Sequence, residues 1–432
     1  MKRFLPIIPF GILFFFLAGY CPEAKVYIDI NSPSSMKFPI AVLKFEKISK
    51  GEGSEKLSEK IDKVLTNDLS ISGRFNVLDS NIMGGSYDRE TVNFGDWFKT
   101  GAIALIKGGF YAKGDNLLLE ARLFDVALSK MICGKRYIGK KEDLQKIVHK
   151  FANEVIYQLT GEQGIFNTKI SFVSDSPGNK EIYTMNFDGS DIKQITSNRS
   201  INLSPIWSLD GREIVYTSYL KGNPDLYIKK LKEGNNIVLS NSPGLNTTPT
   251  FSPDGKLIVL TLSIDGDPEI YSMNKSDHKI KRLTYNWGND TSPFFSPNQK
   301  KIAFVSNRGG TPQIYIMDID GENVQRLTFE GNYNASPSWS PIGDKIAFTS
   351  MHGGYFDIFV INPDGTGLKR LTFDSGDNES PSWSPDGQLL AFSSNRTGRF
   401  NIYMMETNGG NQRPLIFMDG NHTEPSWSSR LE

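Results

Sequence analysis

The sequence predicts a small N-terminal α/β domain followed by an all-β six-bladed β-propeller closed by the C-terminal strand. A short motif recurs every 44 residues through the C-terminal part of the 432-residue chain. The last motif copy has no repeat after it, and the first repeat has no motif before it. The first 160 residues lack this period and mix helical with strand-like patterns. These three observations together favour two domains of different architecture.

The recurring motif is a proline followed, two positions later, by an aromatic residue and then a serine. Its six copies begin at Pro205, Pro249, Pro293, Pro337, Pro381 and Pro425. Each repeat holds short β-rich runs separated by turns rich in Gly, Pro, Asn and Asp, a pattern typical of consecutive antiparallel hairpins. Four strands in about 44 residues are typical of one propeller blade.

Large apolar residues keep the same phase in all repeats. The second predicted strand carries Phe172, Tyr216, Leu260, Phe304, Phe348 and Phe392. The third carries Tyr183, Tyr227, Tyr271, Tyr315, Phe359 and Tyr403. Such residues pack neighbouring blades together, so we expect them in the core.

The two incomplete ends of the repeat array predict how the ring closes. Residues 170–196 supply a second, third and fourth strand without a first, whereas the motif at Pro425 has no strands after it. The C-terminal strand is therefore expected to complete the first blade and leave no open sheet edge.

The segment 25–160 is expected to form the α/β domain, and 161–432 the propeller. Strand patterns cover 26–30, 39–45, 75–78, 102–111, 117–126 and 131–138, and amphipathic helix patterns cover 54–69 and 141–159. They predict helices on one face of a mixed sheet. Gly108-Gly109 lies inside a strand-like run and indicates a bulge or kink.

Residues 1–24 are interpreted as a secretory signal peptide. Lys2 and Arg3 precede a short apolar run that Pro6 and Pro9 interrupt. Lipid attachment at Cys21 and an uncleaved anchor helix remain alternatives. The mature chain is not expected to span a membrane.

Composition and motifs give no sign of nucleic-acid binding or catalysis. Lys plus Arg and Asp plus Glu both number 48, so the net charge does not suggest a polyanion partner. The four histidines form no closely spaced metal pair, and no nucleophile elbow or phosphate loop is present. His149 on the second helix is expected to be structural. We predict a non-enzyme without cofactor or metal.

One propeller face is the better candidate for binding. It receives the longer connections, including those with Arg308 and Arg396, whereas stereotyped tight turns gather on the other face. A polar residue stands three positions before each motif proline: Asn202, Asn246, Asp290, Asn334, Asn378 and His422. These residues either surround the channel mouth or cap the turn into each strand through hydrogen bonds to the backbone, and both roles can hold together.

The chain resembles the TolB family, periplasmic components of the Tol–Pal cell-envelope system. The junction between the domains is the most specific part of the resemblance. The matching residues are Pro39-Ile40-Ala41-Val42, Ser72-Gly73-Arg74-Phe75, Asp96-Trp97 with Gly101-Ala102, Arg122-Leu123-Phe124-Asp125-Val126, His149-Lys150-Phe151-Ala152-Asn153-Glu154, Leu159-Thr160-Gly161, Gly164-Ile165-Phe166 and Ser171-Phe172-Val173-Ser174.

The resemblance implies a non-enzymatic periplasmic adaptor that supports outer-membrane integrity and constriction at cell division. Its propeller would bind the peptidoglycan-associated lipoprotein Pal at the channel mouth, through the six polar residues above together with Arg308 and Arg396. Its N-terminal segment would bind TolA through Lys25, Val26, Tyr27, Ile28, Asp29 and Ile30. A monomer is expected, with other envelope proteins as further partners.

Three other functions compete with the adaptor. A propeller lyase acting on polysaccharide would reveal itself by bound metal or turnover, and a peptidase-type propeller would need a hydrolase domain. A glycan-binding sensor would bind glycan in place of Pal.

Overall fold

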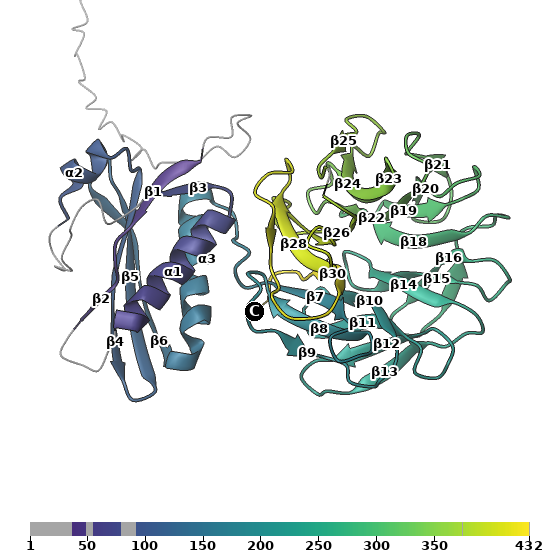
Figure 1. Ribbon diagram of the computed structural model, residues 1–432, viewed down its shortest axis with the longest axis horizontal. Helices are drawn as coiled ribbons and strands as arrows, with labels where there is room; N and C mark the ends of the chain where they lie inside the picture. The colour runs from purple at the N-terminus through teal and green to yellow at the C-terminus, as the bar shows by residue number, and fades with distance from the viewer. Residues whose placement is uncertain (1–36, 49–54, 79–91, 374, 432) are drawn as a thin grey trace, which may run out of the picture.

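The structure is a computed structural model that describes residues 37–48, 55–78, 92–373 and 375–431. It contains the two predicted units, an α/β domain and a six-bladed propeller, lying side by side (Figure 1). The predicted signal peptide, the predicted strand 26–30 and the first residue of the predicted helix 54–69 fall outside the described residues.

The α/β domain is built on one mixed sheet with strand order β3-β1-β4-β5-β6, in which β2 also pairs with β4. Strand β1 is parallel to β3 and β4, whereas β4, β5 and β6 form an antiparallel meander. The elements are β1 (Phe38–Val42), β2 (Glu46–Lys47), α1 (Glu55–Ile71), β3 (Phe75–Leu78), α2 (Phe94–Lys99), β4 (Ala104–Lys113), β5 (Asn116–Asp125), β6 (Lys130–Lys140), η2 (Lys141–Asp143) and α3 (Leu144–Thr160).

The two long helices cover one face of this sheet, as predicted, but a third helix was missed. Ile40 and Ile106 point to the side of α1 and α3, whereas Ala41 and Leu105 point to the opposite side. Trp97 of the short helix α2 packs with that second group. Both faces of the sheet are therefore at least partly covered.

The expected bulge at Gly108-Gly109 is wrong. Strand β4 pairs with β5 without any shift of register from Ala104 to Lys113. Gly108 instead leaves room for an aromatic ring, because a Cβ at this position would lie 2.0 Å from Cε1 of Phe45 and 2.6 Å from the carbonyl oxygen of Glu120.

The propeller consists of six four-stranded antiparallel sheets, and the C-terminal strand closes the first of them, which confirms the predicted ring. The blades, from the innermost strand outward, are β30-β7-β8-β9, β10-β11-β12-β13, β14-β15-β16-β17, β18-β19-β20-β21, β22-β23-β24-β25 and β26-β27-β28-β29. We number them one to six in this order.

The strand bounds repeat with little variation between blades. Blade one has β30 (His422–Trp427), β7 (Lys169–Ser174), β8 (Glu181–Asn186) and β9 (Lys193–Gln194); blade two has β10 (Asn202–Trp207), β11 (Glu213–Ser218), β12 (Asp225–Lys230) and β13 (Asn236–Ser240); blade three has β14 (Asn246–Phe251), β15 (Leu257–Leu262), β16 (Glu269–Asn274) and β17 (Ile280–Arg282). Blade four has β18 (Asp290–Phe295), β19 (Lys301–Ser306), β20 (Gln313–Asp318) and β21 (Gln325–Arg326); blade five has β22 (Asn334–Trp339), β23 (Ile346–His352), β24 (Tyr355–Ile361) and β25 (Lys369–Arg370); blade six has β26 (Asn378–Trp383), β27 (Leu389–Ser394), β28 (Asn401–Glu406) and β29 (Arg413–Pro414).

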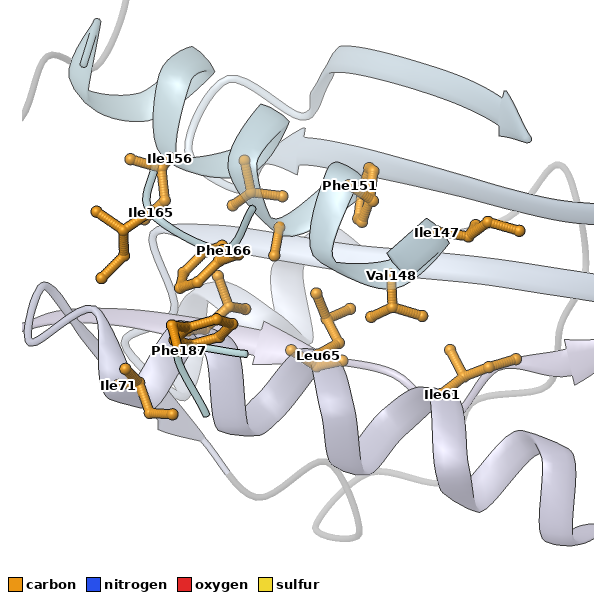
Figure 2. Close-up of a cluster of buried hydrophobic side chains, with 14 of the residues drawn as sticks. Ile61, Leu65, Ile71, Ile147, Val148, Phe151, Ile156, Ile165, Phe166 and Phe187 are labelled. Carbon is orange, nitrogen blue, oxygen red and sulfur yellow. The ribbon is translucent and has the colours of Figure 1, made fainter. Parts of the chain in front are cut away.

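A single hydrophobic core joins the two domains. Side chains of α1 and α3 belong to the same buried cluster as Phe187 of blade one and Met404 of blade six. Phe166, in the segment that links the domains, packs against Phe187 with 5.3 Å between ring centroids. Figure 2 shows these two rings between the helices, beside Leu65 and Ile71 of α1. The junction is therefore a packed interface in this structure.

Candidate functional site

The connections between strands divide the propeller into two faces. In each blade, the turn between the first and second strands and the turn between the third and fourth strands lie on one face, which we call the turn face. The other connections form what we call the loop face: 175–180, 219–224, 263–268, 307–312, 353–354 and 395–400 between second and third strands, and 195–201, 241–245, 283–289, 327–333, 371–377 and 415–421 between blades. The loop face is the one that the sequence favoured for binding.

A central channel opens beside the innermost strands as a cavity of about 450 Å³. Each innermost strand shifts register just before its motif proline, where a non-glycine residue has positive φ. These six residues line the cavity: Ser204, Thr248, Ser292, Ser336, Ser380 and Glu424. Backbone conformations of this kind cost on the order of 1–3 kcal/mol each and are common at functional sites.

The sequence-based reasoning missed this channel lining. Its signal was the hydroxyl residue before five of the six motif prolines, replaced by Glu424 in the last copy. Glu424 accepts hydrogen bonds from the backbone N–H and the hydroxyl of Ser204, at 2.6 and 3.2 Å, across the seam between blades one and two. Burial raises the pKa of its carboxyl.

The six polar residues predicted for the channel mouth all begin an innermost strand, and all are buried. Their side chains hold the adjoining loops. Asn202 Nδ2 donates to the carbonyl oxygen of Lys180 at 3.1 Å, and Asn246 Nδ2 donates to that of Ser242 at 2.7 Å. Because these side chains are buried in this structure, they position the loops that a docking protein would meet first. Their direct contact with a partner stays a prediction.

Three more members of the set also contact the backbone of a loop. Asn334 Nδ2 donates to the carbonyl oxygen of Glu330 at 2.8 Å, and Asn378 Nδ2 donates to that of Gly376 at 3.0 Å. The ring Nε2 of His422 lies 3.2 Å from the carbonyl oxygen of Met418. Burial lowers the pKa of His422, which favours the neutral ring. The capping role proposed for the six positions is therefore present at five of them, Asp290 being the exception.

Two of the predicted residues pair with the two predicted arginines. Arg308 Nη2 donates to Oδ2 of the buried Asp290 at 2.6 Å, and Arg396 Nη2 donates to Oδ1 of Asn378 at 2.8 Å. Burial raises the pKa of Asp290 to about 6, although Ser306 and Arg308 oppose that shift. Both arginines are partly exposed on the loop face, so they are accessible to a partner.

A second polar cluster lies at the domain junction. Asp68 of α1, His149 of α3 and Asp188 of the β8–β9 turn place donor atoms within 4.8 Å of one another. Nδ1 of His149 lies 2.7 Å from Oδ2 of Asp68, and Nε2 lies 3.8 Å from Oδ2 of Asp188. The cluster brings together side chains of α1, α3 and blade one, so we describe it as a polar link between the domains.

The segment predicted to bind TolA, Lys25–Ile30, lies outside the described residues. Its nearest described neighbour is Lys37, whose Nζ lies 2.9 Å from Oε1 of Glu406 in blade six. The chain therefore enters the described structure beside the interface between the two domains.

Comparison with known proteins covers both domains. A family model for the TolB amino-terminal domain matches residues 26–132, and one for the TolB beta propeller domain matches residues 156–431. The chain is 45% identical over 198 residues to a Tol-Pal system protein TolB of Desulfosudis oleivorans and 40% identical over 206 residues to one of Syntrophus aciditrophicus. Each alignment spans 45% of this chain and 45% of the relative.

A solved structure extends the similarity to nearly the whole chain. The crystal structure of TolB from Acinetobacter baumannii matches with a TM-score of 0.80 and 29% identity, and the match covers 91% of this chain and 97% of that one.

Proposed function

This chain belongs to the TolB family, and from that premise we propose that it is a non-enzymatic periplasmic adaptor of the Tol–Pal system. Its propeller binds the peptidoglycan-associated lipoprotein Pal on the loop face, at the channel mouth. Its N-terminal segment, Lys25–Ile30, binds TolA. The assembly supports outer-membrane integrity and constriction of the envelope during division.

One observation carries the proposal: both family domains occur in the same chain and in order, and the full-length structural match preserves their arrangement. Two curated relatives are named Tol-Pal system protein TolB, and each of them matches 45% of this chain. A rigid propeller with variable loops on one face is also a suitable scaffold for protein recognition.

The proposed location is the periplasm, reached by way of the signal peptide 1–24. Within the described part of the chain, no helix is long and apolar enough to cross a membrane.

Calorimetric titration tests the adaptor role directly. The purified mature chain, residues 25–432, is titrated with the soluble domain of Pal and, separately, with the periplasmic domain of TolA. We expect saturable binding of both, and loss of TolA binding alone when residues 25–30 are deleted. Absence of Pal binding by the intact chain would overturn the proposal, and binding of isolated glycan strands in its place would support the sensor alternative.

The two binding events are expected to be coupled through the packed domain junction. Saturating the propeller with Pal should change hydrogen exchange in residues 25–35. Unchanged exchange there would limit the proposal to two independent binding sites.

A further inference from the structure

Exposed aromatic side chains of the propeller gather on one face. Within the described residues, all seven that are more than about a third exposed lie on the loop face, with exposed fractions from 39% at Tyr333 to 87% at Phe417. They are Tyr285, Trp287, Phe329, Tyr333, Tyr355, Phe373 and Phe417. Aromatic residues are enriched at protein interfaces.

Four of these rings occupy one repeat position, 44 residues apart, in the connection that follows the fourth strand. We call Tyr285, Phe329, Phe373 and Phe417 the aromatic arc. The equivalent residues after blades one and two are Ser197 and Asn241. The arc therefore follows blades three to six, and the two remaining copies of this position are polar.

Arginine side chains support three rings of the arc. The guanidinium carbons of Arg282, Arg326 and Arg370 lie 4.7, 5.0 and 4.9 Å from the ring centroids of Tyr285, Phe329 and Phe373, respectively. Cation–π contacts of this kind restrict the rings before any partner arrives, which reduces the entropy lost on binding.

The supporting arginines differ in how their charge is compensated. Arg282 pairs with Glu269 at 2.8 Å, and Arg370 pairs with Asp357 at 2.6 Å. At the same repeat position blade four has Gln313, and Arg326 forms no ion pair with a carboxylate of the described residues. Its Nε instead donates to the carbonyl oxygen of Thr328 at 2.6 Å.

The same contrast recurs at a second repeat position. Arg308 in blade four pairs with the carboxylate of Asp290, whereas its counterpart Arg396 in blade six meets the neutral amides of Asn378 and Gln412. Arg396 likewise forms no ion pair within the described part of the chain. Two cations that have no carboxylate partner among the described residues thus flank blade five, which carries the exposed ring of Tyr355.

We propose that the aromatic arc, Arg326 and Arg396 form the docking surface for a folded protein partner that presents carboxylates between apolar side chains. This inference rests on the proposed function and names the residues that recognise its propeller partner. Aromatic residues and arginine are enriched at protein interfaces and dominate their binding energy. Carboxylates of the partner would supply Arg326 and Arg396 with the negative charge that the neutral side chains of Gln313 and Asn378 lack.

Binding of the soluble Pal domain to designed variants of the full mature chain tests this surface. Phe329→Ala with Phe373→Ala removes two rings, and Arg326→Gln with Arg396→Gln removes the two cations. Ile342→Ala, an exposed apolar residue of the turn face, is the matched control. We expect each double variant to raise the Kd by about tenfold or more and the control to leave it unchanged.

Salt dependence separates the two contributions. The Kd of the wild type should rise with ionic strength more steeply than that of the arginine variant, because the variant has lost the charged contacts. Thermal melts within a few degrees of the wild type would show that the variants fold. Wild-type binding with unchanged affinity in both double variants would overturn the docking surface alone, whereas no binding by the wild type would overturn the proposed function and this inference with it.

Discussion

The ring Nδ1 of His149 lies 2.7 Å from Oδ2 of Asp68, and this buried pair faces Asp188 of the propeller across the domain junction. Two atoms of the pair, Oδ1 of Asp68 and Nε2 of His149, have no hydrogen-bond partner among the described residues. Buried polar atoms without partners are costly, so the junction combines a strong apolar core with a sensitive polar link.

The carboxyl of Asp68 should make stability depend on pH. Burial raises its pKa to about 6, against hydrogen bonding from His149 that lowers it. Because the folded chain then holds this proton more tightly than the unfolded chain, the contribution favours folding below about pH 4 and is lost as pH rises through about 6. Asp68→Asn should remove this fall, which amounts to on the order of 2–3 kcal/mol. Urea unfolding of the wild type and of Asp68→Asn at pH 4.5 and pH 7 measures this change in the free energy of unfolding.

The imidazole of His149 contacts this carboxyl directly and needs its own control. Repeating the comparison in a His149→Gln background separates the carboxyl from the imidazole. A free energy of unfolding that changes equally with pH in the wild type and Asp68→Asn would contradict the assignment to Asp68.

Removing either loop-face arginine should have unequal costs. Arg308→Ala leaves the buried carboxylate of Asp290 unpaired, so we expect a loss of about 3 kcal/mol in the free energy of unfolding. Arg396→Ala leaves the neutral amides of Asn378 and Gln412 and should cost about 1 kcal/mol. Chemical denaturation of both variants tests the difference, and Asp290→Asn with Arg308 retained should stay within about 1 kcal/mol of the wild type. Equal losses of unfolding free energy in the two arginine variants would show that the charge of Asp290 does not cause the destabilisation.

Adding one methyl group at Gly108 should strongly destabilise the α/β domain. The new Cβ would overlap the ring of Phe45 and the backbone of β5, so we expect Gly108→Ala to cost about 3 kcal/mol or more. Gly134→Ala in β6 is the control, because its Cβ would find its nearest neighbour at 3.5 Å, an ordinary contact. Gly108→Ala should melt at a clearly lower temperature than Gly134→Ala. Similar melting temperatures would mean that β4 and Phe45 can move apart with little loss of free energy.

The sequence predicted the propeller well because packing between blades imposes a residue type on each strand position, and the period exposes it. The sequence pattern could not show whether the polar residues at the starts of the innermost strands are buried. A polar residue before each motif proline is compatible with a surface rim or a buried cap, and only the structure places Asn202 and Asp290 inside. The left-handed residues before the prolines also escaped notice, since the residue before a proline usually favours an extended conformation.

Features without a period were predicted less well. Helix α2 has only six residues, and one of them is Gly95. So short a segment with a glycine inside it shows no helical pattern that can be identified from the sequence. The role of Gly108 depends on Phe45, which lies far away along the chain, so the local sequence indicated a bulge where the structure has a close contact. The aromatic arc has the same 44-residue period as the core residues and could have been found by comparing exposed positions.

Closure of the ring by β30 should dominate propeller stability. The strand pairs with β7, and Trp427 donates from Nε1 to Oγ1 of Thr168 at 2.8 Å. Deleting residues 425–432 exposes the edge of blade one and opens the core shared with the α/β domain. We expect the melting temperature to fall by more than about 10 °C. Trp427→Phe keeps most of the apolar contact and loses one hydrogen bond, so it should cost only about 1 kcal/mol. A truncated chain that melts like the intact protein would refute closure as the main source of propeller stability.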